Sequence, residues 1–262
     1  MKRRVLVGSV PTPDGGELTL HRHGDDFHLA VDGDELMSSR AHGSEEELAE
    51  LCLAPLRDRP SPRVLVGGLG MGYTLRAALD ALAAGREVSA EPSQGSGRRV
   101  SPAPRPGPQN VPAETSRRVL RPEVVVAEFF PAVVEWNRGP LAHLAGRPLD
   151  DPRARVYLGD LADLLTGEPP DGPSWDAILL DLDTGPGAVT LERNRALYGP
   201  AGLARLHAAL TPGGTLGVWS AHPDPAFLRR LREAGFDPRA HRTRARKGGK
   251  GWRHEIFVGR RV

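Results

Sequence analysis

The stretch that decides the fold reads Val64-Leu65-Val66-Gly67-Gly68-Leu69-Gly70-Met71-Gly72, and a helical pattern follows it over residues 73–84. An apolar strand that runs into a glycine-rich turn lets the backbone approach a ligand that side chains would exclude. The helix that follows offers free N–H groups to the same ligand. Glycines also serve ordinary tight turns, so such a loop alone is a weak signal. Its place between a strand and a helix favours a ligand site, with Gly67, Gly68, Gly70 and Gly72 as candidate binding residues.

Apolar runs and helical stretches alternate on the C-terminal side of this loop. The apolar runs are 64–66, 124–127, 156–158, 177–180 and 216–219, and the helical stretches lie near 73–84, 131–145, 195–210 and 224–234. Such alternation is typical of βαβ units in a parallel sheet that is buried on both faces. Residues 211–214 (Thr-Pro-Gly-Gly) indicate a tight turn into the fifth strand, and 239–244 with 255–258 indicate a closing antiparallel pair. The sequence therefore predicts an α/β fold with a class I methyltransferase-type, Rossmann-like sheet of seven strands.

The segment before the loop has a different pattern. Residues 1–40 form short alternating runs separated by turn residues, which predicts a small antiparallel β unit. Ser44-Glu45-Glu46-Glu47 has the pattern of a capping box, and leucines at 48, 51 and 53 supply an apolar helix face. We expect two parts, an N-terminal β unit over 1–43 and a Rossmann-like nucleoside-binding domain over 44–262.

Residues 88–118 interrupt the second part. They are rich in proline, serine, glycine and arginine, and such a composition buries too little apolar surface to offset its ordering entropy. We expect a flexible surface insertion between the first helix and the second strand of the domain.

Composition limits the alternatives. The 35 Lys and Arg residues nearly balance 33 Asp and Glu residues, for a net charge of +2, whereas nucleic-acid binding needs basic residues clustered on one face. The single cysteine, Cys52, cannot form an internal disulfide or a cysteine-based zinc site. No apolar run approaches the ~18 residues of a membrane span. We expect a cytoplasmic protein with neither a membrane nor a nucleic acid as partner.

Acidic residues follow the second and third predicted strands. Glu128 ends the run 124–127, and once the insertion is discounted its distance from Gly72 fits a carboxylate that holds ribose hydroxyls. The alternative interpretation of Glu128 is a carboxylate at the end of the strand that faces water. Gly159-Asp160 ends the third strand, where the aspartate could meet an adenine amino group. Asp160 could equally cap the helix that follows, and the two roles are compatible.

Two more carboxylates, Asp181 and Asp183, follow the fourth predicted strand. Ligands of open α/β sheets bind at the carboxyl ends of the strands, and carboxylates at this edge could orient an amine and accept its proton. These two residues are the candidate catalytic groups. Turn chemistry, closed by Thr184-Gly185-Pro186, is the alternative, more so for Asp183 than for Asp181.

These motifs together resemble the spermidine synthase family, in particular its bacterial spermidine-synthase-like branch. The ordered set is LMSSR (36–40), VLVGGLGMG (64–72), VVAE (125–128), GD (159–160), LLDLDTGP (179–186) and LTPGGTLGVWS (210–220). The resemblance implies a transferase that uses decarboxylated S-adenosylmethionine or S-adenosylmethionine to alkylate a small amine, without a metal. It assigns the ribose to Glu128, the adenine to Asp160 and amine deprotonation to Asp181. Because family members are often dimers or tetramers, it also implies a homodimer.

The sequence departs from the family where the acceptor and the transferred group bind. Gly70 stands where polyamine-forming members carry the aspartate of GGGDGG, which holds the amino end of the aminopropyl group. The family pattern D-[ST]-[ST]-D-P is replaced by DLDTGP (181–186), and the tyrosine and glutamine that hold putrescine are not evident. An S-adenosylmethionine-dependent methyltransferase is therefore the first alternative. A non-catalytic nucleoside- or RNA-binding protein, drawing on the basic tail 239–254, is the second.

Overall fold

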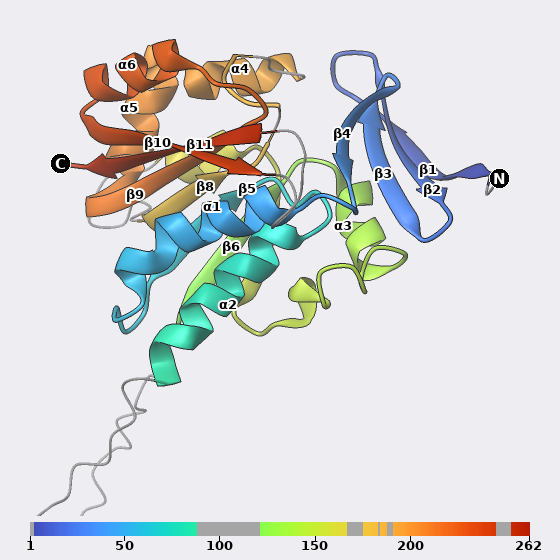
Figure 1. Cartoon of the computed structure of the whole chain (residues 1–262), viewed down its shortest axis with the longest axis horizontal. Coiled ribbons are helices and arrows are strands. Elements are labelled where there is room, and N and C mark those ends of the chain that lie inside the picture. Colours follow the sequence, from blue (N-terminus) through green and yellow to red (C-terminus); the bar gives the residue numbers. More distant parts are fainter. Residues whose placement is uncertain (1–2, 88–120, 167–174, 183, 188–190, 245–252) are drawn as a thin grey trace, which may run out of the picture.

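The computed structural model describes residues 3–87, 121–166, 175–182, 184–187, 191–244 and 253–262. Its N-terminal part is a four-stranded antiparallel sheet (Figure 1). The strands follow chain order: β1 (Arg4–Pro11), β2 (Glu17–His23), β3 (Asp26–Val31) and β4 (Asp34–Ser38). Leu18, Leu20 and Leu29 are buried and belong to the same apolar core as the larger sheet. The predicted small antiparallel β unit is confirmed.

The second sheet has seven strands in the order β10-β11-β9-β8-β5-β6-β7. Their bounds are β5 (Arg63–Gly67), β6 (Glu123–Glu128), β7 (Ala154–Leu158), β8 (Trp175–Leu180), β9 (Leu210–Ser220), β10 (Phe236–Arg244) and β11 (Arg253–Arg261). Strands β5 to β9 pair with one another in parallel, whereas β11 pairs antiparallel with both β9 and β10. The predicted Rossmann-like sheet with an antiparallel closing pair is confirmed.

Helices cover both faces of this sheet (Figure 1). Their bounds are α1 (Gly43–Leu53), η1 (Ala54–Leu56), α2 (Tyr73–Glu87), α3 (Pro131–Arg138), η2 (Pro148–Asp150), η3 (Leu161–Leu165), α4 (Glu192–Tyr198), α5 (Pro200–Ala209) and α6 (Pro225–Glu233). Helices α1, α2 and α3 share one core cluster with the N-terminal sheet, and α4, α5 and α6 pack with strand residues in the other. All six residues of β8 are buried, as a strand covered on both faces requires.

The predicted capping box at Ser44 is wrong. Helix α1 begins at Gly43 after the N-cap residue His42, and no side chain caps it. The Ser44 hydroxyl instead donates to the Glu45 carboxylate at 2.6 Å, and both side chains are buried. The sequence pattern failed because contacts across the fold engage the side chains of both box residues: Ser44 Oγ lies 2.9 Å from Nδ1 of His254, and Glu47 accepts from the Thr243 hydroxyl.

Two helix predictions extended too far. The stretch 131–145 is helical only to Arg138, because Gly139 precedes Pro140 and a residue before proline avoids helical backbone angles. The stretch 195–210 divides at Gly199, whose extended backbone lets Pro200 open α5.

The expected turn over 211–214 lies inside β9. Trp175 pairs with Leu210 and Ala177 pairs with Thr215, so the four residues between them form a bulge within one strand. The Thr211 hydroxyl donates to Asp176 on the neighbouring strand at 3.1 Å. The prediction of a tight turn before the fifth strand is therefore wrong, because β9 already begins at Leu210 and contains these residues.

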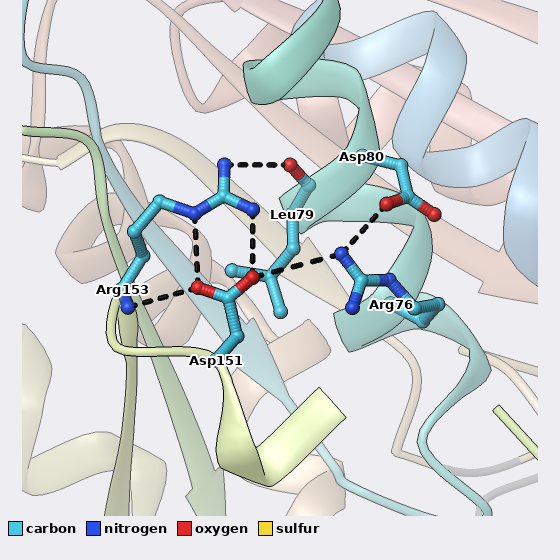
Figure 2. A network of polar contacts seen from close by, with 5 residues as sticks. All are labelled: Arg76, Leu79, Asp80, Asp151 and Arg153. Atoms are coloured by element: carbon cyan, nitrogen blue, oxygen red, sulfur yellow. Dashed lines mark hydrogen bonds and ion pairs between the residues drawn. The ribbon is translucent and has the colours of Figure 1, made fainter. Parts of the chain in front are cut away.

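Figure 2 shows a polar network that ties α2 to the loop before β7. Arg153 donates to the Asp151 carboxylate at 2.9 and 2.7 Å and to the carbonyl of Leu79 at 2.9 Å. Arg76 lies 3.7 Å from Asp151 and 2.6 Å from Asp80. The Arg153 side chain, mainly through its hydrogen bonds, lowers the pKa of Asp151. The network fixes the outer edge of the sheet to the helix that follows the glycine-rich loop.

Within the described residues, no helix is long and apolar enough to cross a membrane. A cytoplasmic location stays a prediction. The predicted insertion, 88–118, lies outside the described residues.

Candidate functional site

A pocket of about 400 Å³ lies where the N-terminal sheet meets the carboxyl ends of β5, β6 and β8. The small sheet contributes Leu18, Leu29, Val31, Glu35, Leu36, Met37 and Ser38 to its lining; the large sheet and its loops contribute Gly68, Gly70, Glu128, Asp181, Trp219 and His254. Helix α1 adds Glu45. The pocket is therefore built by both sheets, at the edge where open α/β sheets bind their ligands.

The glycine-rich loop passes very close to the end of β8. Gly68 has a φ of +88°, and a Cβ at this position would overlap the backbone oxygen of Asp181. Its N–H donates to the carbonyl of Ala127 at 2.9 Å. Since no other residue tolerates both the backbone angle and the close approach, Gly68 joins the ends of three strands.

Gly70 faces the N-terminal sheet. Its φ is +50°, and a Cβ there would lie 3.0 Å from Sδ and 3.2 Å from Cε of Met37. The Met37 side chain thus occupies the space next to the position where the related family carries an aspartate. The wall of the pocket at this point is a thioether instead of a carboxylate.

Asn137 of α3 holds the same loop from behind. Its side-chain amide donates to the carbonyl of Gly70 at 2.8 Å and to that of Val133 at 2.9 Å. The side chain is buried. The sequence offered no signal for this role, because a polar residue within an amphipathic helix is ordinarily solvent-facing.

Glu128 ends β6 and is 7% exposed. Its carboxylate accepts hydrogen bonds from the backbone N–H of Leu69 at 3.0 Å and of Phe130 at 2.8 Å. Burial raises the pKa of Glu128, while these amides act in the opposite direction. The alternative of a water-facing carboxylate is wrong, since Glu128 lies in the pocket wall and organises the loop.

Asp160 caps the helix η3. Its side chain accepts from the N–H of Ala162 at 2.9 Å, as the capping alternative predicted. The described residues that line the pocket do not include four of the predicted binding residues, namely Gly67, Gly72, Gly159 and Asp160. Contact between Asp160 and an adenine stays a prediction.

Asp181 lies in the pocket directly after β8. Its carboxylate accepts a hydrogen bond from the Thr74 hydroxyl, at the start of α2, at 2.6 Å. Its own N–H donates to the carbonyl of Gly67 at 2.9 Å. Burial raises the pKa of Asp181 to about 6. A carboxyl group that titrates near neutral pH is suited to accept a proton and release it again. The other catalytic candidate, Asp183, lies outside the described residues.

Glu45 is a second acid in the same pocket, and the sequence reading missed it. It is 5% exposed. Burial, and next the charge of Asp181, raise its pKa to about 8. Because the two acids interact, their protons titrate as a pair. The capping-box interpretation pairs Ser44 with Glu47 and gives Glu45 no role. For this reason the sequence did not single out Glu45 as a pocket residue.

His254 also reaches this group from the far end of the chain. Its Nδ1 lies 2.9 Å from Oγ of Ser44, and its ring meets that of Trp219 edge to face. Burial, and then the nearby His222, lower its pKa. The sequence reading placed His254 in a basic tail and gave no indication that it enters the pocket.

The pocket is acidic. Four of its described lining residues are carboxylic acids, namely Glu35, Glu45, Glu128 and Asp181, and none is Lys or Arg. When these acids are ionised, such a wall attracts cations and disfavours anions. Across the part of the chain that the structure describes, no group of three or more His, Cys, Asp or Glu residues is placed to hold a metal ion.

This fold and site define a class: a Rossmann-like α/β domain with a glycine-rich loop and a small β unit that closes an acidic pocket. Within that class the sequence resembles polyamine aminopropyltransferases from Mycobacterium tuberculosis (strain ATCC 25618 / H37Rv) and Mycobacterium bovis (strain ATCC BAA-935 / AF2122/97), at 32% identity over 120 residues. The match covers 44% of this chain and 22% of each relative, so the matched region spans about a fifth of their length. No family model matches the chain.

Solved structures give the same result for the whole fold. Spermidine synthase from Thermotoga maritima matches with a TM-score of 0.65 at 16% identity, over 98% of this chain and 73% of that one. A spermidine synthase in complex with the transition-state analogue AdoDATO matches with a TM-score of 0.64 at 16% identity, over 98% and 72%. The resemblance to the spermidine synthase family is confirmed.

Proposed function

We propose that this protein is an aminopropyltransferase-like enzyme that moves an alkyl group from decarboxylated S-adenosylmethionine to a small amine. The observation that carries the proposal is the acidic pocket at the ligand edge of the sheet. Both reactants of such a transfer are cations, a sulfonium and an ammonium, and a wall of carboxylates suits both.

The residues around the pocket can share the work. Glu128 and the loop at Gly68 would hold the nucleoside half of the donor, since a buried carboxylate can accept hydrogen bonds from ribose hydroxyls and a bare glycine admits close approach. Asp181 would hold the amine and take its proton. The amine lone pair then forms a bond to the carbon beside the sulfonium, the carbon–sulfur bond breaks toward sulfur, and a neutral thioether leaves.

Product analysis tests this function directly. The protein is incubated with decarboxylated S-adenosylmethionine and a panel of primary amines, and methylthioadenosine is measured as the leaving group. Asp181→Asn should lower kcat by about 10²- to 10⁴-fold and leave the Kd for methylthioadenosine nearly unchanged. Asp237→Asn, an exposed aspartate on β10, serves as the matched control. No methylthioadenosine with any amine would refute the proposal, and equal losses of kcat and affinity would refute the role of Asp181.

Methyl transfer from S-adenosylmethionine is the second candidate. The observation that favours it is Met37 beside Gly70, at the position where the pattern of the resembled family has the aspartate that holds the amino end of the aminopropyl group. Calorimetry with both donors separates the two reactions: tighter binding of the decarboxylated donor supports aminopropyl transfer, and tighter binding of S-adenosylmethionine supports methyl transfer. Binding of neither would favour a non-catalytic protein.

The remaining assignments are also proposals. The acceptor would be a small-molecule amine, and the resemblance supports a homodimer, which light scattering of the purified protein tests.

A further inference from the structure

A line of polar groups begins at Glu45, which lines the same pocket as Asp181 and whose pKa is raised by burial and then by the charge of Asp181. The Ser44 hydroxyl donates to Glu45 Oε2 at 2.6 Å, and His254 Nδ1 lies 2.9 Å from the same hydroxyl. Ser44 is fully buried and Glu45 is 5% exposed. These groups come from three elements, α1, the end of β8 and β11, so no local turn or cap explains their meeting.

The number of protons on these groups decides which of them donates and which accepts in each hydrogen bond. A hydroxyl has one proton to donate, so when Ser44 donates to an ionised Glu45, His254 must donate from Nδ1 to the Ser44 oxygen. When Glu45 carries a proton and gives it to Ser44, the hydroxyl donates to Nδ1, and the imidazole proton moves to Nε2. The line therefore has two complete arrangements, in which every donor and acceptor changes role.

The surroundings of the line favour such exchange. The groups that face Glu45 are Asp181, Glu46, the Tyr73 phenol and Ser44. His254 faces Trp219 and the exposed His222. None of the described residues that line the pocket is Lys or Arg, so no fixed cation holds either acid in its ionised form. His254 itself is partly exposed, which gives the line an exit toward solvent.

We propose that Glu45, Ser44 and His254 form a proton relay that returns Asp181 to its basic form after each transfer. Asp181 takes a proton from the amine and passes it across the pocket to Glu45, Glu45 passes one to Ser44, Ser44 passes one to Nδ1 of His254, and Nε2 releases one to solvent. One proton enters and one leaves, with no change in charge along the line. Ser44 and His254 act through Asp181 and are positioning residues. The role in turnover rests on the proposed transferase function, whereas the two arrangements of the line do not.

The first test needs no turnover. Nitrogen NMR of the His254 imidazole reports which ring nitrogen carries the proton. The expected result is a change from the Nε2–H to the Nδ1–H form as Glu45 loses its proton with rising pH. The change should be absent in Glu45→Gln and present in Glu50→Gln, an exposed residue of the same helix. A single tautomer across the whole range, or the same change in Glu45→Gln, overturns the relay.

The second test uses activity. Ser44→Ala and His254→Gln should each lower kcat by at least about tenfold, with KM nearly unchanged and a larger solvent isotope effect. Ser61→Ala and His241→Gln lie outside the pocket lining and should keep the wild-type kcat. Unchanged kcat in both relay variants overturns the relay while the transferase stands. Absence of methylthioadenosine from the wild type refutes the transferase function, and the NMR result then decides the relay by itself.

Discussion

At the scale of single residues, Gly70 is where the sequence departs from the pattern of the spermidine synthase family that it resembles. An aspartate there would need Met37 to move, because its Cβ would lie 3.0 Å from the Met37 sulfur. We expect Gly70→Asp combined with Met37→Ala to raise the preference for decarboxylated over ordinary S-adenosylmethionine by about tenfold, the effect of ~1.4 kcal/mol. The new carboxylate would attract the amino end of the first donor and repel the carboxylate of the second. Calorimetric Kd values for both donors measure this ratio.

Two variants control that experiment. Met37→Ala alone opens the space without adding charge, and Gly70→Asn with Met37→Ala adds an uncharged side chain of the same shape. If the asparagine variant shifts the preference as far as the aspartate variant, shape and not charge selects the donor.

Glu45 should make stability fall as pH rises. Its pKa in the folded protein, about 8, lies above the ordinary value of 4.5, so between these values the folded chain holds a proton that the unfolded chain has released. Rising pH then favours unfolding, by as much as about 1.4 kcal/mol per pH unit. We expect Glu45→Gln to flatten the dependence, as measured by urea unfolding at several pH values between 5 and 8 (about the window of the shift). Glu50→Gln should retain the pH dependence of the wild type. If the unfolding free energies of wild type and Glu45→Gln changed with pH in parallel, the raised pKa of Glu45 would be contradicted.

At the scale of elements, α3 is coupled to the glycine-rich loop through Asn137. Asn137→Ala removes the donors to the carbonyls of Gly70 and Val133 and should cost about 1–3 kcal/mol of unfolding free energy. We also expect weaker binding of methylthioadenosine, because the loop loses its support. Arg138→Ala, the next and exposed residue, is the matched control. A stable variant with unchanged nucleoside affinity would show that the loop holds its form without α3.

The elements also show what the sequence could and could not reveal. Strands β5, β6 and β8 were predictable because each is a short apolar run, and their carboxyl ends share one edge, which brings Glu128 and Asp181 to the pocket. Helix ends were less predictable, since Gly139 and Gly199 matter only through the prolines that follow them. Glu45 and His254 could not be found, because their meeting depends on how α1 and β11 pack, which no local pattern encodes.

At the scale of the whole molecule, the predicted insertion should be dispensable. We consider replacing residues 88–118 with a glycine-serine linker of about eight residues, about a quarter of the original length. The shorter loop costs less entropy to close, which would raise the free energy of unfolding by about 1 kcal/mol. Thermal unfolding and methylthioadenosine binding measure the result. Loss of folding or of binding would show that the insertion belongs to the core or the site.

The division into parts 1–43 and 44–262 stays a prediction, and the shared core of the two sheets argues that they unfold together.

The hydrogen bond between Ser44 and His254 joins positions 210 residues apart in the chain. During synthesis Ser44 leaves the ribosome long before His254 has been added, so the nascent protein can build both the glycine-rich loop and Asp181 while the polar line is still open. If the relay operates as proposed, a nascent chain could bind its nucleoside before it could turn over efficiently. Synthesis itself would then delay full activity until the last hairpin has paired with the sheet.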